Sequence, residues 1–330
     1  MNVFVTGASG FIGAALVTEL QQRGHEVIAL VRRRAQFDQM VALGVRPVWC
    51  DLFSIDRLAQ AMAGCEVVFH LAGENKWGVR NPYPMLKVNI AGTVSVAQAA
   101  KQAGVRRLVY TSSAAAIGEA KGTIGREDSV YRGWHMSEYE ASKRSAEAAL
   151  LEMTGLEIVI VNPSSVQGPG RVAGTGKIML AIVNGTLPVF VDTRFSICHI
   201  TDCVQGHILA AERGQPGERY ILSGATVTTG EVFGQLAEIT GLKLRPRYIP
   251  HWLAMGGAIV AQYYAWARGR DPSWSREKMA AILHGHHFDG SKATRELGLQ
   301  YTPLSRALYE TIQWYREHGL IRRPLPRLDP

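Results

Sequence analysis

Three glycines near the start of the chain constrain its fold more than any other feature. They stand in Thr6-Gly-Ala-Ser-Gly-Phe-Ile-Gly13, between a short apolar run and an amphipathic segment that extends to Gln22. This order predicts a strand, a turn and a helix, in which Gly7 permits the turn, Gly10 lets backbone approach a ligand and Gly13 allows tight helix packing. Because the helix N-terminus offers free N–H groups and a partial positive charge, the loop suits a pyrophosphate. An ordinary tight turn is the alternative interpretation.

Strand-like and helix-like segments alternate beyond this loop. Further strands are predicted by apolar runs at residues 25–31, 46–50, 66–72, 107–111 and 157–161. Helices are predicted at 54–63 with Ser54 as its cap, at 87–104, and from a Ser137 cap, in a capping-box pattern with Glu140, to about residue 153. Such alternation predicts an α/β protein with a Rossmann-type doubly wound parallel sheet and a ligand at the carboxyl ends of the strands.

Composition excludes several classes of protein. The chain has 330 residues and a net charge of +8, but its basic residues are scattered, so we expect no nucleic-acid partner and attribute the balance to an anionic ligand or to a solvated basic surface. No secretory signal is visible, and the four cysteines show no metal or disulfide pattern, which favours free thiols in the cytoplasm.

One uncharged segment, Tyr248 to Ala267, is long enough to span a bilayer. Its proline, histidine and paired glycines argue against stable membrane insertion. We predict a buried helix of a smaller domain, with Tyr263, Tyr264 and Trp266 in the core or lining an apolar cleft, and contact with a membrane surface is the alternative.

A run of arginines follows the second predicted strand, where an acidic side chain would bind the ribose 2′-hydroxyl of NAD. The residues here are Val31-Arg32-Arg33-Arg34. Guanidinium groups match a 2′-phosphate, so Arg32 and Arg33 predict a preference for NADP, although NAD remains possible. A solvated turn with incidental arginines is the alternative.

The residues for acid–base chemistry lie after the fifth predicted strand. Ser112 and Ser113 stand at its carboxyl end, and Tyr139 and Lys143 are one turn apart on one face of the following helix. A nearby ammonium favours the phenolate and lowers the pKa of a phenol toward neutrality, and a serine hydroxyl can stabilise charge on a substrate oxygen.

These motifs together resemble the extended short-chain dehydrogenase/reductase superfamily, also described as the NAD-dependent epimerase/dehydratase family. The resemblance rests on Thr6 to Gly13, His70 to Gly73, Ser112-Ser113, Tyr139 to Lys143 and Asn162-Pro163, and it covers essentially the whole chain. It implies that Tyr139 is the general acid, that Lys143 also holds the nicotinamide ribose and that Ser113 orients the substrate carbonyl. Residues 188–192, 218–224, 288–292 and 296–298 are most similar to dihydroflavonol-reductase-like proteins and hopanoid-associated sugar epimerases.

The resemblance also implies a cofactor site and a division into domains. The expected cofactor-binding residues are Gly7, Ser9, Gly10, Phe11, Ile12, Gly13, Arg32, Arg33, Asp51, Leu52, Leu71, Ala72, Gly73, Asn89, Thr111, Tyr139, Lys143, Asn162, Pro163 and Ser165. Residues 1–165 would form the nucleotide-binding domain, completed by 196–224. Residues 166–195 and 225–330 would mainly form a smaller, mixed substrate-binding domain, and Asp202 would cap a helix through Glu212.

One departure from the family pattern bears on the substrate. Where sugar-nucleotide epimerases carry an arginine and an aspartate, this chain has Phe195 and Ser196, with Arg194 one residue away. This favours an NADP-dependent reductase that converts a ketone or aldehyde of a small, fairly apolar substrate. An epimerase or dehydratase with tightly bound NAD and a non-catalytic NADP-binding module are the alternatives, and the chain could act as a monomer or a homodimer.

A metal site is not expected. His284, His286 and His287 lie close together, but no acidic or thiol residue is adjacent in the sequence. A solvated loop is the predicted environment of these histidines.

Overall fold

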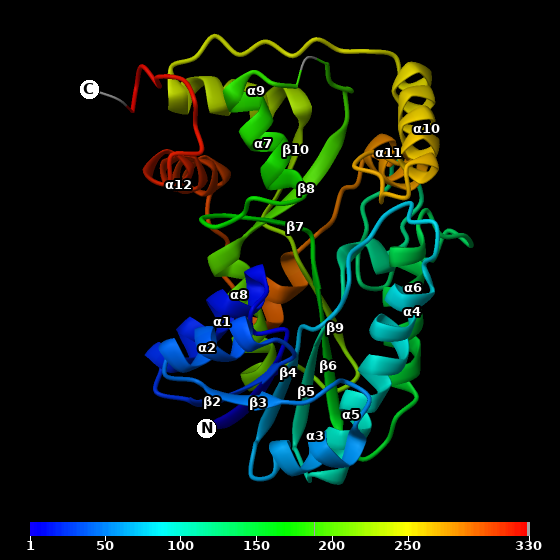
Figure 1. The fold of residues 1–330 in the computed structure, drawn as a ribbon, viewed down its shortest axis with the longest axis vertical. Helices are drawn as coiled ribbons and strands as arrows, with labels where there is room; N and C mark the ends of the chain where they lie inside the picture. The colour runs from blue at the N-terminus through cyan, green and yellow to red at the C-terminus, as the bar shows by residue number, and fades with distance from the viewer. Residues whose placement is uncertain (188, 329–330) are drawn as a thin grey trace.

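A seven-stranded parallel sheet forms the larger lobe of the protein. The structure is a computed structural model that describes residues 1–187 and 189–328. Within them the sheet has the order β3-β2-β1-β4-β5-β6-β9 (Figure 1). Its strands are β1 (Asn2–Thr6), β2 (Glu26–Val31), β3 (Arg46–Trp49), β4 (Val67–His70), β5 (Arg107–Thr111), β6 (Glu157–Pro163) and β9 (Arg219–Leu222). Every neighbouring pair is parallel, which confirms the predicted doubly wound fold.

Helices cover both faces of this sheet because its strands carry apolar side chains on both sides. On one face α1 (Phe11–Gln22) and α8 (Ile200–Arg213) pack over the sheet through a buried cluster that includes Leu16 and Ile208. The other face is covered by α3 (Ile55–Met62), α5 (Gly92–Gln102) and α6 (Glu138–Leu151). α2 (Arg34–Ala42) connects β2 to β3.

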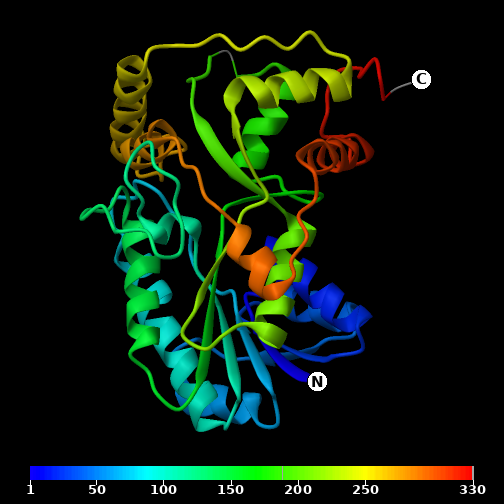
Figure 2. The ribbon, with the colours of Figure 1, turned by 180° about the vertical axis from the view of Figure 1, so that it is seen from behind.

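A smaller lobe is built on a mixed three-stranded sheet of order β10-β8-β7. β7 (Ser165–Gln167) is parallel to β8 (Arg194–His199), and β10 (Ala225–Thr228) is antiparallel to it. The helices α7 (Thr175–Asn184), α9 (Thr229–Thr240) and α12 (Leu304–Glu317) enclose a separate core with this sheet. Figures 1 and 2 show this lobe above the carboxyl ends of the large sheet.

The chain crosses between the two lobes several times. β6 leads to β7, β8 leads directly into α8, and β9 leads to β10. Strand pairing assigns residues 194–199 to the small sheet and residues 219–222 to the large one. The division of the chain into two independent domains stays a prediction.

The predicted helix from residue 87 to 104 is interrupted. It begins earlier as α4 (Tyr83–Leu86), passes through a π-helical turn at Lys87–Ala91, labelled η1, and continues as α5. Asn89 lies in this turn, and such turns often mark functional sites. Two other short turns are the 3₁₀ turn η2 (Ala114–Ile117) and the π turn η3 (Ala293–Leu297).

Helix caps follow the sequence only in part. The Ser137 side chain caps α6 by accepting a hydrogen bond from the Glu140 amide, although the Glu140 carboxylate accepts from Met136 rather than from Ser137. Ser54 precedes α3 but donates its hydroxyl to Asp51. The prediction that Asp202 caps α8 is wrong. Asp202 lies within the first turn of α8, and its carboxylate accepts two hydrogen bonds from Thr302.

The uncharged segment forms α10 (His251–Ala267), but the predicted burial is wrong. Only Ala254 and Ala258 are buried, where α10 packs on α11 (Arg276–His284). Trp252, Tyr263 and Tyr264 are exposed, whereas Trp266 is half-buried and donates a hydrogen bond to the Gly78 carbonyl over 3.0 Å. Both views place α10 at an outer edge of the molecule (Figures 1 and 2). The apolar sequence of a helix does not reveal how many other elements of the fold pack against it. Among the described residues, no helix combines the length and apolar character that crossing a membrane requires.

Candidate active site

The glycine turn after β1 has the geometry of a nucleotide-binding loop. Gly7 has a φ of +72°, and an added Cβ would lie 2.7 Å from the Ala72 amide nitrogen. A Cβ at Gly13 would lie 2.1 Å from the Gly7 carbonyl oxygen, so close packing requires glycine there. Gly10 is the N-cap of α1, and the N-terminal end of this helix presents free backbone N–H groups. The loop thus brings unencumbered backbone to the carboxyl edge of β1 and β4.

Side chains behind the loop hold the two strands in register. The Thr6 hydroxyl contacts His70 Nδ1 over 2.7 Å and accepts a hydrogen bond from the Ala72 amide over 3.1 Å. Burial lowers the pKa of His70 to about 3, so this imidazole is neutral and serves hydrogen bonding.

Arg32 and Arg33 extend from the end of β2 into solvent. Their backbone amides donate to Gln36 Oε1 over 3.0 and 3.2 Å, while the Gln36 amide donates to the Ser9 hydroxyl over 2.8 Å. Gln36, which no sequence pattern indicated, connects the arginine turn to the glycine loop. Within the described ranges neither arginine has a carboxylate within ion-pair distance, so both guanidinium groups are free to bind an anion.

Asp51 and Leu52 follow β3. The Asp51 carboxylate accepts from the Phe53 amide over 2.6 Å and from Ser54, and these hydrogen bonds lower its pKa. Leu52 is buried, with its side chain near Gly92. The Asp51 side chain therefore organises its own turn.

The segment Leu71 to Gly73 after β4 is held by Asn89 in the π turn. The Asn89 side chain accepts from the Glu74 amide over 2.8 Å and donates to the Glu74 carbonyl over 2.9 Å. A Cβ at Gly73 would lie 3.3 Å from Lys143 Nζ. Asn89 thus acts on the backbone beside the site, and the absence of a side chain at Gly73 lets this backbone approach Asn89 and Lys143 closely.

The structure brings Ser113 and Tyr139 together. The Ser113 side chain lies close enough to the buried Tyr139 phenol to influence its pKa, and its hydroxyl also accepts a hydrogen bond from the Ala115 amide over 3.3 Å. Burial raises the pKa of Tyr139, and Ser113 and the nearby Arg171 guanidinium offset part of this rise. The Trp77 ring covers the phenol at a centroid distance of 5.7 Å. The pair can therefore supply a proton and a hydrogen bond to one oxygen atom in a shielded place.

Lys143 contacts the end of β5, and its role toward Tyr139 and the nicotinamide ribose stays a prediction. Its Nζ donates to the Thr111 carbonyl over 2.8 Å and lies 3.4 Å from the Tyr110 hydroxyl. Desolvation lowers the pKa of Lys143 to about 8, although Glu147 opposes the shift. Ser113 and Arg171 favour the phenolate of Tyr139.

Asn162 joins the end of β6 to Ser113. Its amide donates to the Ser113 carbonyl over 3.0 Å and to Glu147 Oε1 over 2.6 Å. Thr111 turns its hydroxyl toward His207, over 2.8 Å. The Ser165 hydroxyl lies 3.0 Å from that of Thr175, beyond Pro163 at the end of β6. Asn162 therefore positions the backbone that carries Ser113.

Two residues near Tyr139 were missed in the sequence. Trp77 lies in an irregular segment, and Arg171 lies in a glycine-rich loop after β7. The Arg171 guanidinium carbon stands 5.1 Å from the centroid of the Phe11 ring, and its Nε has no hydrogen-bond partner among the described residues. No local pattern points to either residue, because both reach the site through tertiary folding.

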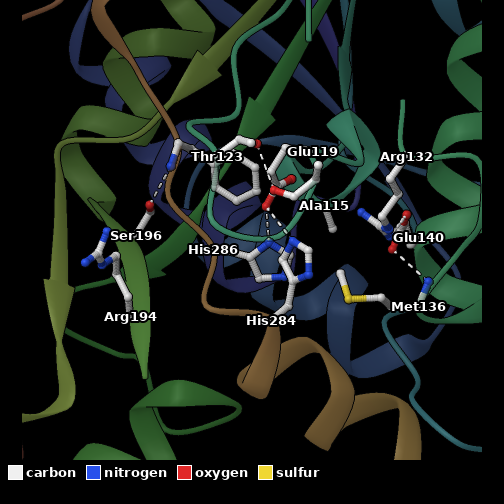
Figure 3. Close-up of polar contacts among 12 residues, drawn as sticks. Ala115, Glu119, Thr123, Arg132, Met136, Glu140, Arg194, Ser196, His284 and His286 are labelled. Atoms are coloured by element: carbon white, nitrogen blue, oxygen red, sulfur yellow. Dashed lines mark hydrogen bonds and ion pairs between the residues drawn. The ribbon is translucent and has the colours of Figure 1, made fainter. Parts of the chain in front are cut away.

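Phe195 and Ser196, which stand where sugar-nucleotide epimerases carry an arginine and an aspartate, have structural contacts within the protein. Phe195 packs in the small-lobe core, and the Ser196 hydroxyl accepts from the Phe288 amide over 2.9 Å. Arg194 is exposed, and Figure 3 places it away from the histidine cluster.

The predicted solvated environment of the histidines is wrong for two of them. His284 is buried and His286 mostly so, and both rings point toward the carboxylate of buried Glu119 (Figure 3). Glu119 is far away in the sequence, which is why it was missed. These three residues can hold a metal ion in principle, since their potential ligand atoms lie within 4.8 Å of one another.

A serine in contact with a buried phenol, under a nucleotide-type glycine loop, characterises an NAD(P)-dependent enzyme of the oxidoreductase type. The chain belongs to the NAD dependent epimerase/dehydratase family, which it matches over residues 3–223.

Relatives extend over almost the whole chain. A protein of Synechocystis named as a dihydroflavonol 4-reductase is 34% identical and aligns with 97% of this chain and 96% of its own length. Sterol demethylase protein B of Methylococcus capsulatus is 32% identical, and the alignment covers 97% of this chain and 100% of that protein. A ketoreductase of Stigmatella aurantiaca, named for a farnesyl-substituted oxo-dihydroquinoline N-oxide, is 30% identical, and the alignment covers 90% of this chain and 91% of that protein.

Solved structures share the fold. The protein gox2253 superposes with a TM-score of 0.83 and is 34% identical, covering 97% of this chain and 99% of its own. MoeE5, solved with UDP-glucose and NAD, has a TM-score of 0.75 and 27% identity, covering 97% and 100%.

Proposed function

We propose that this protein is an NADP-dependent reductase of a ketone or aldehyde in a small, fairly apolar substrate. The observation that carries the proposal is the proximity of Ser113 to Tyr139 beside the Trp77 ring, because the two hydroxyls offer two hydrogen-bond donors to a single oxygen atom. The replacement of the charged sugar-nucleotide pair by Phe195 and Ser196, and the ketoreductase name of the Stigmatella relative, support a carbonyl substrate.

In this proposal each side chain has a separate task. Ser113 donates a hydrogen bond to the carbonyl oxygen, and Tyr139 transfers its proton to that oxygen as negative charge develops there. Burial raises the pKa of Tyr139, so the phenol is protonated at neutral pH and ready to act as an acid. Lys143 is the buried cation at the edge of the site. The reduced nicotinamide, when bound, supplies the hydride.

The residues present fit a nicotinamide dinucleotide. The N-cap of α1 and the Gly7 turn, which only glycine adopts readily, leave backbone N–H groups for a pyrophosphate, and Asn89 and Lys143 lie close to Gly73, where a side chain would crowd them. The exposed Arg32 and Arg33, without ion-pair partners in the described chain, supply charge for a 2′-phosphate. The match between these two guanidinium groups and a 2′-phosphate is our reason for preferring NADP over NAD.

A second candidate is an epimerase or dehydratase that retains NAD. It is favoured by the similarity to MoeE5, which was solved with UDP-glucose and NAD. The nucleotide released by mild acid from freshly purified protein distinguishes the two. NADP, or a site that refills with NADPH, is expected for the reductase, whereas tightly held NAD together with turnover of a sugar nucleotide would replace our proposal by the epimerase.

The catalytic test is Tyr139→Phe in single-turnover reactions with a panel of ketones and aldehydes. We expect NADPH oxidation to fall by at least about 100-fold while NADPH binding by fluorescence is kept. Tyr309→Phe is the control, because this exposed tyrosine of α12 lies outside the site. Undiminished turnover in Tyr139→Phe would refute the assignment, and absence of turnover in the wild type across the panel would favour a binding module.

A further inference from the structure

Glu119, His284 and His286 form a compact cluster outside the Ser113–Tyr139 pair. His286 Nδ1 lies 2.6 Å from Glu119 Oε1, and His284 Nε2 lies 3.4 Å from the same oxygen. All three ligand atoms lie within 4.8 Å of one another, and the two rings converge on the carboxylate in Figure 3. Glu119 lies in the segment after η2. His284 is the last residue of α11, and His286 follows it in the next segment.

Backbone pairing fixes these two segments side by side. Gly125 forms a parallel bridge with Phe288, its amide donates to the His287 carbonyl over 2.8 Å, and its carbonyl accepts from the Asp289 amide over 2.9 Å. The His286 ring also stacks on Phe288, at a centroid distance of 5.3 Å and an interplanar angle of 17°. The two imidazoles are therefore oriented before any ligand arrives, which is a property of a built site.

The cluster has unsatisfied lone pairs. Glu119 is 1% exposed, and its carboxylate has only the two histidines as ion-pair partners among the described residues. Glu119 Oε2 and His284 Nε2 have no hydrogen-bond partner in the described structure. A buried carboxylate is costly unless it is paired with a cation and fully hydrogen-bonded, and a bound metal ion would supply both a positive charge and a partner for these free lone pairs.

We propose that Glu119, His284 and His286 bind one divalent transition metal ion, with Zn²⁺ as the best match. Two imidazoles and one carboxylate are a ligand set of four-coordinate zinc sites that keep one open position, whereas Mg²⁺ and Ca²⁺ prefer oxygen ligands throughout. Bond lengths of about 2.0 to 2.2 Å place tetrahedral ligands roughly 3.4 Å apart. The His284–Glu119 distance of 3.4 Å already meets this, and His286 must withdraw slightly from its hydrogen bond.

The site would tie together two segments that meet beside the active site. Glu119 follows η2 directly after Gly118, and η2 begins immediately after Ser113. The histidines belong to the segment that returns from α11 toward Phe288 and the large lobe. The ion would clamp these segments and take no part in proton transfer by Tyr139. This inference does not depend on the proposed reductase activity.

The test is metal binding by the full-length chain without a polyhistidine tag, after treatment with a chelator. Isothermal titration with Zn²⁺ should give one site with a dissociation constant below about 10 μM. Glu119→Gln and His286→Ala should each weaken it by about 10- to 100-fold. His287→Ala is the matched control, because it removes the neighbouring imidazole outside the cluster and should leave binding unchanged.

Two further measurements keep the result decisive. Circular dichroism establishes that each variant is folded, and His284→Ala replaces any variant that is not. The Co²⁺-loaded protein should show visible absorption without thiolate charge-transfer bands, since no cysteine lies in the cluster. Absence of zinc uptake, uptake that survives all three ligand substitutions, or thiolate bands would each overturn the proposal.

Discussion

The Asn162 amide donates hydrogen bonds to the Ser113 carbonyl over 3.0 Å and to Glu147 Oε1 over 2.6 Å. One side chain thereby connects three elements: the end of β6, the segment after β5 and helix α6, which also carries Tyr139 and Lys143. The position of Ser113 relative to Tyr139 depends on this amide.

Replacing Asn162 by alanine should therefore separate positioning from cofactor binding. We expect kcat to fall roughly 10- to 100-fold, because the Ser113 segment loses its anchor. Stability should fall by about 1 to 3 kcal/mol, since buried Glu147 loses a donor. Steady-state kinetics and urea unfolding measure the two effects, and unchanged kcat in a folded variant would show that Asn162 is not needed for positioning.

Arg32 and Arg33 should decide the choice between the two nicotinamide cofactors. The double change to alanine is expected to weaken NADPH binding by roughly 10- to 100-fold and NADH binding little, because only NADPH carries a 2′-phosphate. Fluorescence titration with both cofactors is the measurement. Arg46→Ala is the control, since this exposed arginine lies at the amino end of β3, away from the carboxyl end of the neighbouring β2 that Arg32 and Arg33 follow. Equal losses for the two cofactors would contradict the assignment.

Lys143 should make stability depend on pH in an identifiable window. Burial lowers its folded-state pKa from 10.5 to about 8, so between these values the unfolded chain binds more protons and the free energy of unfolding rises with pH. Between pH 7 and 9.5 this contribution is about 2 kcal/mol, which Lys143→Met should lack.

Urea unfolding of the cofactor-free protein at both pH values measures this contribution. Lys101→Met, a change at an exposed position of α5, should keep the wild-type pH dependence. Identical pH dependence in wild type and Lys143→Met would mean that the lysine is not desolvated as described.

The packing of α10 gives a contrast between large and small residues. Trp252 is 74% exposed, so Trp252→Ser should change the free energy of unfolding by less than about 0.5 kcal/mol. Ala258 is buried against α11, and Ala258→Leu should cost about 1 to 3 kcal/mol through overpacking. Thermal unfolding compares the two, and a large loss from Trp252→Ser would place the tryptophan in an interface.

The sequence was sufficient where structure is local or strictly periodic. The glycine turn, the parallel strands and the helix that presents Tyr139 and Lys143 follow from spacing and apolar runs, and the structure confirms these elements. Burial of α10 failed as a prediction for most of its large residues because an apolar helix needs neighbours, and here the fully buried residues of α10 are Ala254 and Ala258.

Contacts between distant segments were also beyond the sequence. Glu119 and His286 are separated by 167 positions, and no local pattern signals that a buried carboxylate meets them. The hydrogen bond from Lys143 to the Thr111 carbonyl was unpredictable for the same reason, because its acceptor is a backbone group on another element.

The repeated crossing between lobes has a mechanical consequence. β6 continues to β7, β8 runs without a linker into α8, and β9 continues to β10, so three chain connections join the two lobes. A single connection would let the small lobe rotate freely, whereas several connections resist twisting and still permit bending about a common hinge. We therefore expect the small lobe to open and close over the large sheet by hinge bending, without rotating relative to it.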